Sequence, residues 1–420
     1  MQERLHIKNF AGIKEVTLEL RRMNVLIGPQ ATGKSVCAKL LYHFKGFLSD
    51  IFAAVENQET MRDLDAAFLQ KFEQYFPPAS WGKGAFHLRY ELGGAFVEIC
   101  RGEGRQSKPD LSYSATFREL FEHCLGELKK ARRKQAEWLE LAPVKIFQEL
   151  QQAWIEAACT QLGDEAGFTQ VFIPAGRSFF ANLQSSVFSL LSTNQAIDPL
   201  LAEFGRFYEG LRHLPADRQT EHKNGLSKRL QTLTEFILRG KHVEEKGKDF
   251  LQLPDGRRVN IANASSGQQE MLPLAIILSV LPFLGAANRG FTVYIEEPEA
   301  HLFPNSQRAI VQLLATVFNR SKAPVQFIVT THSPYILTAA NNLMQAGHLI
   351  KRLPQKDHGS VHAVVPEDQI LVPDAVRAYA LEAGTANLIC CEDTGLISAD
   401  VIDDVSNDLS IQFGELLEME

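Results

Sequence analysis

The sequence lacks the features that define several large classes of protein. Six cysteines occur among its 420 residues, and no two of them form a Cys-x-x-Cys pair. Structural zinc sites and disulfide-rich secreted domains depend on closely spaced cysteines, so we expect neither and predict a reduced, cytoplasmic protein. The 43 basic and 50 acidic side chains leave a formal net charge of −7. A surface that binds nucleic acid would therefore have to be a local basic patch.

Long hydrophobic runs are also scarce. The longest, residues 271–287, is short for a membrane span and contains Pro273 and Pro282, so we interpret it as a buried helix and expect no membrane partner. No extended heptad pattern predicts a coiled-coil rod, and the alternating first residues do not resemble a signal peptide. The content of 45% hydrophobic and 22% charged residues is typical of a globular protein with two or three domains.

The strongest motif lies near the N-terminus. Residues 24–27 are a short apolar run, residues 28–35 fit the phosphate-loop pattern GxxxxGK[ST], and residues 36–42 follow with helical spacing. The two glycines let the loop curl so that backbone N–H groups face phosphate oxygens, and the helix N-terminus adds partial positive charge. We assign Lys34 to the β- and γ-phosphates and Ser35 to Mg²⁺. The nucleotide-binding candidates are Gly28, Pro29, Gln30, Ala31, Thr32, Gly33, Lys34 and Ser35.

Two adjacent carboxylates follow a buried strand much later in the chain. Residues 290–295 form the strand, and Glu296 and Glu297 come directly after it. Such a pair is costly at the carboxyl end of a strand unless a cation or a reacting water uses it. We therefore assign Glu296 to the Mg²⁺ shell and Glu297 to the orientation of the attacking water. The alternative is an exposed acidic turn, which the preceding apolar strand disfavours.

Two weaker patterns flank this strand. Ser265, Ser266, Gly267 and Gln268 begin the long apolar helix and predict an anion site, although a plain helix cap would explain them equally well. Residues 324–331 predict a further strand that ends in His332. A lone histidine is usually structural, but downstream of a phosphate loop and a carboxylate strand we interpret it as a γ-phosphate sensor.

The intervening residues are mainly helical. Helical patterns cover residues 116–162, with a break at Pro143, and residues 178–240. The basic run at residues 129–134 fits either a phosphate-contacting patch or a solvated helix face, and the flanking glutamates favour the second interpretation.

Together these motifs resemble the head of an ABC-type ATPase. Residues 28–35 match Walker A, residues 265–268 the signature motif, residues 293–297 Walker B with its catalytic glutamate, and His332 the switch histidine. The stretches 296–304 and 331–335 resemble more narrowly the overcoming-lysogenization-defect (OLD) and SMC-like repair branch. That branch includes stand-alone ATPases of antiphage systems such as Septu, PARIS and some retrons.

The chain departs from this resemblance at several points. Ser266 stands where a glycine is usual, and Glu296 stands where Walker B usually has aspartate. The Q-loop glutamine is not identifiable, the zinc-hook cysteine motif is missing, and no Toprim-like nuclease module is recognisable after His332. The acidic, apolar-faced stretch at residues 397–420 predicts a docking element or a packed terminal helix.

The resemblance implies a fold and a way of working. We expect an α/β head assembled from residues 1–110 and 244–350, a mainly helical domain inserted at 111–243, and a C-terminal tail at 351–420. ATP and Mg²⁺ would be sandwiched between two copies of the chain in a dimer or higher homo-oligomer. The first functional hypothesis is an antiphage or repair ATPase that switches a separate effector such as a nuclease. The alternatives are an ATPase that grips DNA or RNA itself and, less favoured, the ATPase subunit of a transporter.

Overall fold

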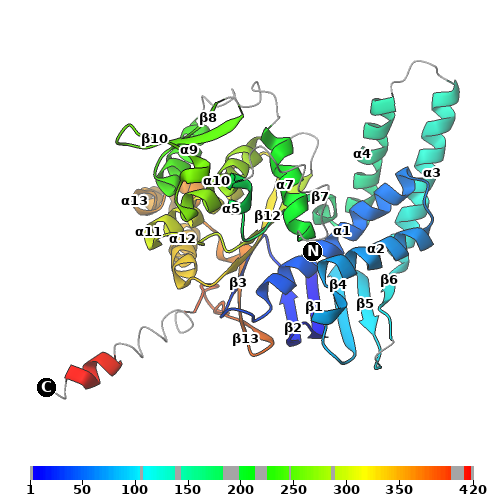
Figure 1. Ribbon diagram of the computed structural model, residues 1–420, viewed down its shortest axis with the longest axis horizontal. Helices are drawn as coiled ribbons and strands as arrows, with labels where there is room; N and C mark the ends of the chain where they lie inside the picture. The colour runs from blue at the N-terminus through cyan, green and yellow to red at the C-terminus, as the bar shows by residue number, and fades with distance from the viewer. Residues whose placement is uncertain are drawn as a thin grey trace.

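The computed structural model describes residues 3–104, 107–137, 143–182, 198–212, 225–245, 247–284, 289–398 and 411–417. Its centre is an eleven-stranded sheet in the order β6-β5-β4-β1-β2-β14-β13-β3-β12-β11-β7 (Figure 1). One half of this sheet is parallel and the other antiparallel. Within the described chain, no helix is long and apolar enough to cross a membrane.

The parallel half combines strands from distant parts of the sequence. It consists of β13 (Val376–Glu382), β3 (Met23–Ile27), β12 (Val325–Thr331), β11 (Gly290–Glu296) and β7 (Phe168–Ile173). Every residue of β3, β11 and β12 is buried, as expected of parallel strands covered on both faces. The predicted α/β fold built from both ends of the chain is confirmed.

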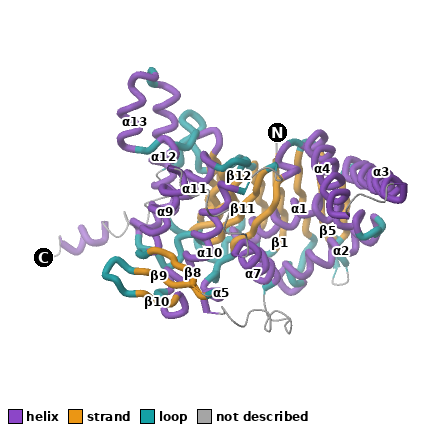
Figure 2. The backbone as a smooth tube through the Cα atoms, turned by 90° about the horizontal axis from the view of Figure 1, so that it is seen from above, coloured by secondary structure: helices purple, strands orange, loops and turns teal. Residues whose placement is uncertain are grey.

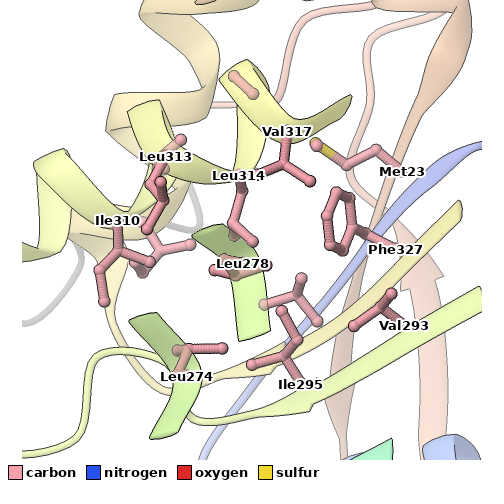
Figure 3. Close-up of a cluster of buried hydrophobic side chains, with 14 of the residues drawn as sticks. Met23, Leu274, Leu278, Val293, Ile295, Ile310, Leu313, Leu314, Val317 and Phe327 are labelled. Carbon is pink, nitrogen blue, oxygen red and sulfur yellow. The ribbon is translucent and has the colours of Figure 1, made fainter. Parts of the chain in front are cut away.

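Helices cover both faces of the parallel half. On one face lie α10 (Ser266–Val280), α11 (Pro304–Arg320) and α12 (Pro334–Arg352). Figure 3 shows Leu274 and Leu278 of α10 and Leu314 of α11 facing Val293 and Phe327 of the sheet. On the other face, α1 (Lys34–Glu56) packs against side chains such as Leu26 and Tyr294. The phosphate-loop helix is therefore anchored along its whole length.

The antiparallel half is built around two hairpins. Strand β1 (Glu3–Phe10) pairs with β2 (Ile13–Glu19), and β4 (Phe86–Leu92) pairs with β5 (Ala95–Arg101). Alternate side chains are buried against α1 and α2 (Met61–Tyr75), which gives the period-two pattern seen in the sequence. The short edge strand β6 (Asp110–Tyr113), which pairs with β5, was not predicted.

The remaining described elements lie around the sheet. At one end of the long axis α3 (Ala115–Glu137) and α4 (Pro143–Leu162) form a pair, and α13 (His358–Val364) lies on the opposite side of the sheet from them (Figures 1 and 2). Helices α5 (Ser178–Asn182), α7 (Pro199–Arg212) and α9 (Gly225–Leu238) follow β7. After α9, a separate three-stranded antiparallel sheet consists of β8 (Lys241–Glu245), β9 (Lys248–Gln252) and β10 (Arg258–Asn260).

Two strands extend the sheet beyond the parts assigned to the head. Strand β7 lies within the range predicted as the inserted domain and pairs with β11, and β13, within the predicted tail, pairs with β3. Strand β14 (Thr385–Leu388) then joins β13 to β2, so the tail connects the two halves of the sheet. The domain limits themselves stay predictions.

Farther on, residues 411–417 form a helix whose large apolar side chains are exposed, and residues 399–410 lie outside the described chain.

Candidate nucleotide-binding site

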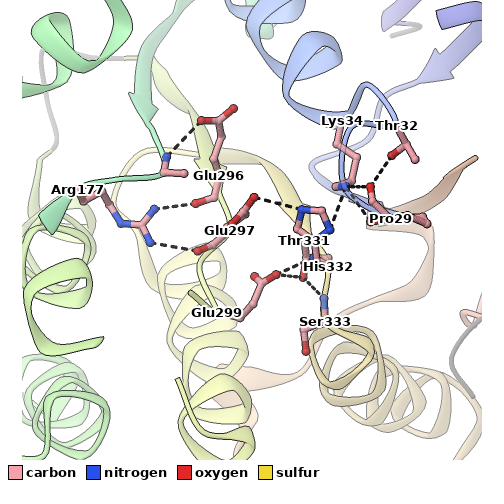
Figure 4. Close-up of polar contacts among 12 residues, drawn as sticks. Pro29, Thr32, Lys34, Arg177, Glu296, Glu297, Glu299, Thr331, His332 and Ser333 are labelled. Carbon is pink, nitrogen blue, oxygen red and sulfur yellow. Dashed lines mark hydrogen bonds and ion pairs between the residues drawn. The ribbon is translucent and has the colours of Figure 1, made fainter. Parts of the chain in front are cut away.

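The sheet brings the phosphate loop, the carboxylates and the histidine to one edge. In the parallel register Ile27 lies opposite Thr331, and Thr330 lies opposite Glu296. The segments that leave β3, β12 and β11 at their carboxyl ends are therefore neighbours, as ligand-binding segments are in parallel sheets. Figure 4 shows Lys34, His332 and Glu297 converging there.

The phosphate loop is folded tightly enough to require its glycines. A Cβ on Gly28 would lie 2.2 Å from the carbonyl oxygen of Leu381 in β13, and Gly33 has a φ of 98°. Lys34 Nζ donates to the carbonyl oxygens of Gly28 at 2.8 Å and Pro29 at 2.7 Å. These bonds hold the ammonium inside the loop. Burial lowers the pKa of Lys34, and the nearby Glu297 and Glu299 oppose that shift.

Lys34, His332 and Glu297 form a continuous polar chain. Lys34 Nζ lies 3.3 Å from Nδ1 of His332, and Nε2 of the same ring lies 3.2 Å from Oε1 of Glu297. An ammonium can only donate, so Nδ1 is the acceptor and the Nε2–H donates to the carboxylate. The chain joins the phosphate loop to the carboxylate through one neutral imidazole, and its three members are those predicted to contact the γ-phosphate and the water.

Glu297 has an uncommon backbone conformation. Its φ is 45°, in the left-handed region that glutamate rarely adopts. Its N–H donates to the carbonyl oxygen of Thr330 at 2.9 Å, which ties it to β12. Non-glycine residues persist in this conformation only where their surroundings determine it, and such residues concentrate at functional sites.

Glu296 provides a carboxylate suited to a cation. The residue is buried, its Oε2 accepts the N–H of Ala175 at 3.2 Å, and its Oε1 has no hydrogen-bond partner. An unpartnered buried carboxylate oxygen is costly, by about 1–3 kcal/mol or more. Carboxylate and hydroxyl oxygens are ligands that Mg²⁺ accepts, so Glu296 and the exposed Ser35 at the start of α1 fit the predicted cation.

Glu299 was not assigned a role from the sequence, although it follows the carboxylate pair closely. Its Oε1 accepts hydrogen bonds from Thr331 Oγ1 and from the N–H of His332, both at 2.7 Å. The carboxylate therefore holds the turn that carries the histidine. The sequence shows an acidic run around Pro298, but only the tertiary contacts show which of its carboxylates supports the turn.

Arg177 is the second residue that sequence reasoning missed. Its side chain is fully buried and donates to backbone carbonyl oxygens of Pro174, Glu270, Glu296 and Glu297. Figure 4 shows the contacts with Glu296 and Glu297. Burial lowers the pKa of its guanidinium, and Glu270 and the other nearby glutamates oppose that shift. In the sequence Arg177 follows a short apolar run, and a single arginine at such a place is not a recognisable motif.

The predicted signature residues begin α10. Ser265 caps the helix and forms a capping box with Gln268, while Ser265 and Ser266 are both exposed. A Cβ on Gly267 would lie 2.7 Å from the carbonyl oxygen of His301, so the glycine permits close packing on the loop after β11. Among the described contacts, no hydrogen bond or ion pair joins residues 265–268 to Lys34, Glu297 or His332.

The basic run is only partly within the described structure. Lys130 forms an ion pair with Glu127 of the same helix at 2.7 Å, and the side chains of Arg133 and Lys134 lie outside the described residues. The pairing of Lys130 agrees with the interpretation of this run as a solvated helix face.

Two known proteins are similar to this chain in sequence. The chain is 22% identical over 388 residues to the OLD nuclease of Thermus scotoductus, covering 90% of this chain and 66% of that protein. It is 32% identical over 102 residues to the probable ATPase of retron Vc95 from Vibrio cholerae, covering 22% of this chain and 19% of that protein. The chain therefore spans less than two thirds of the length of both relatives. They confirm the predicted resemblance to the OLD and retron branch of ABC-type ATPases.

Among solved structures, heads of SMC proteins align with most of this chain. An SmcHead bound to the C-winged helix domain of ScpA aligns with 92% of this chain and 96% of its own, with 13% identity and a TM-score of 0.41. The SMC head domain from Thermotoga maritima aligns with 93% of this chain and 99% of its own, with 12% identity and a TM-score of 0.36.

A family model also matches the chain directly. It is described as "AAA domain, putative AbiEii toxin, Type IV TA system" and covers residues 23–338, from the start of β3 to the first turns of α12. That range contains the phosphate loop, the carboxylate pair and the switch histidine, and it is three quarters of the chain. The protein therefore belongs to this family of AAA-type ATPase domains.

Proposed function

We propose that the chain binds ATP with Mg²⁺ at this edge of the sheet and hydrolyses it to ADP and phosphate. The observation that carries the proposal is the chain of contacts from Lys34 through His332 to Glu297. It supplies a cation for the phosphates, a hydrogen-bonding ring for the γ-phosphate and a carboxylate for water at one place. The unpartnered oxygen of Glu296 adds a ligand for the metal ion.

Each side chain has a defined role in this mechanism. The loop N–H groups and Lys34 bind the phosphates, and the start of α1 adds its partial positive charge. Glu297 accepts a hydrogen bond from the attacking water and orients it toward the γ-phosphate, while His332 holds the carboxylate and contacts the transferred group. Glu296 and Ser35 would hold Mg²⁺, which would supply positive charge beside the phosphates.

We further propose that a second copy of the chain completes each site. The exposed Ser265 and Ser266 are free to meet the nucleotide of another copy. Two large exposed aromatic side chains, Phe303 and Tyr335, follow the carboxylate strand and the switch histidine closely, and their exposures are 71% and 53%. Exposed aromatic groups beside a polar site are typical of a surface that associates. The expected assembly is a dimer with two shared nucleotides.

A mixing experiment tests both parts of this proposal. Lys34→Ala removes the phosphate cation, and Ser266→Arg blocks the signature surface while leaving the Ser265 and Gln268 cap in place. Each variant alone should be inactive. A mixture should regain ATPase activity, because a mixed dimer contains one site with an intact Lys34 and an intact Ser266. Inactive mixtures with normal ATP binding by the Ser266 variant would contradict the shared site.

In the cell, we propose that this ATPase switches a separate effector, a nuclease, in antiphage defence or repair. The support is the similarity to an OLD nuclease and to a retron ATPase, together with the ATPase activity proposed above. Purification of the tagged full chain should recover a nuclease activity, and Lys34→Ala should change that activity at equal recovery of the bound protein. Nuclease activity that is missing, or identical in both preparations, would contradict this role.

A further inference from the structure

We propose that Arg177 is a positioning residue for Glu297 and connects that carboxylate to the signature helix. The inference rests on the proposed ATPase function and adds to it a residue outside all of the recognised motifs. It starts from an unusual contact set. Arg177 is the largest side chain in the molecule, among the described residues, that is fully buried, and its guanidinium reaches three separate segments.

The first contacts surround the carboxylate pair. Nη1 donates to the carbonyl oxygen of Glu296 at 2.7 Å, and Nη2 donates to that of Glu297 at 3.1 Å. Nη1 also donates to Pro174 at 2.9 Å, at the end of β7. The guanidinium therefore holds the carbonyl groups of both carboxylate residues while leaving their side chains free to act.

The hydrogen bonds from Arg177 matter because Glu297 has a left-handed backbone conformation. Its N–H donates to Thr330 of β12, and its carbonyl accepts from Arg177 and from the N–H of Ala300, so both flanking peptide groups are held. The left-handed conformation is unfavourable for glutamate, and it relaxes when one of its supports is removed. Relaxation would turn the carboxylate away from His332, which lies 3.2 Å away.

The other contacts lead to the signature helix. Nε donates to the backbone carbonyl of Glu270 in α10 at 3.1 Å, and the Glu270 carboxylate lies 3.6 Å from the same nitrogen. Ser178 Oγ holds that carboxylate at 2.6 Å. Glu270 lies one turn after residues 265–268, so a displacement of the start of α10 reaches Glu297 through Arg177. A nucleotide that contacts the signature motif of one copy would thereby change how Glu297 of that same copy orients water.

The test is Arg177→Lys, which keeps the charge but cannot reach four carbonyl groups in three segments. We expect kcat for ATP to fall by about 10- to 100-fold, as misplacement of a catalytic group does, while KM and ATP affinity stay within about twofold. The matched control is Arg22→Lys. Arg22 donates twice to the carbonyl of Val325 at the opposite edge of the sheet, so its loss should leave kcat unchanged.

A double variant separates positioning from a purely structural role. If Arg177 acts through Glu297, adding Arg177→Lys to Glu297→Gln should lower the residual rate by less than about twofold. A further tenfold loss in that background, or a parallel loss of ATP affinity, would overturn the inference, as would unchanged kcat in the single variant. A wild-type chain without ATPase activity would instead refute the proposed function itself.

Discussion

The two halves of helix α1 show what distinguishes the nucleotide edge from the packed interior. At its start, Lys34 is held by loop carbonyls beside a glutamate in a left-handed conformation and a buried carboxylate oxygen without a partner. Farther along, His43 is buried with neither ring nitrogen hydrogen-bonded, and it stacks on Phe68 with 4.0 Å between ring centroids. Both regions leave polar atoms unsatisfied, but for different reasons. At the edge a ligand can satisfy them, whereas in the interior aromatic packing offsets the cost.

This comparison predicts that changes at the edge alter ATP chemistry, while changes in the interior alter stability. The largest expected effect is that of Lys34→Ala, which should abolish measurable ATP binding, since it removes the ammonium held by the loop carbonyls, and leave the melting temperature of the nucleotide-free chain unchanged. Lys39→Ala is the control on the same helix. Lys39 Nζ forms an ion pair with Asp198 Oδ2 at a distance of 2.9 Å, and this pair does not involve the phosphate loop. Titration with a fluorescent ATP analogue measures the affinity of both variants. Unchanged affinity in the Lys34 variant would contradict the assignment of the nucleotide site to this loop.

The matching change in the interior is Phe68→Ala. Phe68 packs against His43, Phe44 and Phe47, so its loss should lower the free energy of unfolding by about 3–5 kcal/mol. ATP affinity of the folded fraction should not change. Gln70→Ala, at an exposed position of α2, serves as the control and should stay within about 0.5 kcal/mol. Chemical denaturation measures the stabilities. A Phe68 variant that loses ATP affinity while folded would contradict the expectation that changes in the interior alter stability alone.

A third change sharpens the contrast within the edge itself. Glu297→Gln keeps the hydrogen-bonding shape but removes the charge that polarises water, so kcat should fall by about 10²- to 10³-fold with ATP affinity preserved. Dimers should accumulate with ATP, which light scattering after size exclusion detects. Turnover at the wild-type rate would mean that another residue orients the water.

The smallest expected effect is a pH dependence of stability in the interior. Burial holds the pKa of His43 well below its ordinary value, so the folded chain keeps this ring neutral while the unfolded chain protonates it. The unfolded state then binds more protons as pH falls, and stability is lost below the unfolded pKa of about 6.5. Between pH 7.5 and 5.5 the loss should be about 1.4 kcal/mol.

The variant His43→Leu should lack this part of the pH dependence, and His123→Leu, at an exposed position of α3, should keep it. Urea denaturation at the two pH values measures the difference. Equal slopes in the wild-type chain and the His43 variant would mean that the buried ring is already protonated in the folded state.

Local patterns predicted the elements that carry the candidate site. The run of residues 24–27 before the phosphate loop and the run ending at Glu296 are buried strands, as expected of continuous apolar stretches. Strand β13 was missed because residues 376–382 mix polar and apolar side chains without strict alternation and match no motif. Its place beside β3 depends on pairing with a strand some 350 positions earlier, which no local pattern records.

The sequence by itself determined which chemical groups the site contains, because the phosphate loop, the carboxylate pair and the histidine each follow an apolar run whose length and composition make it a strand. Only the tertiary structure decided that Arg177 and Glu299 support them, and that Glu297 has a left-handed backbone. The physical reason is that strand formation depends on neighbouring residues, whereas a buried guanidinium is satisfied by carbonyl groups that come together only when the sheet is complete.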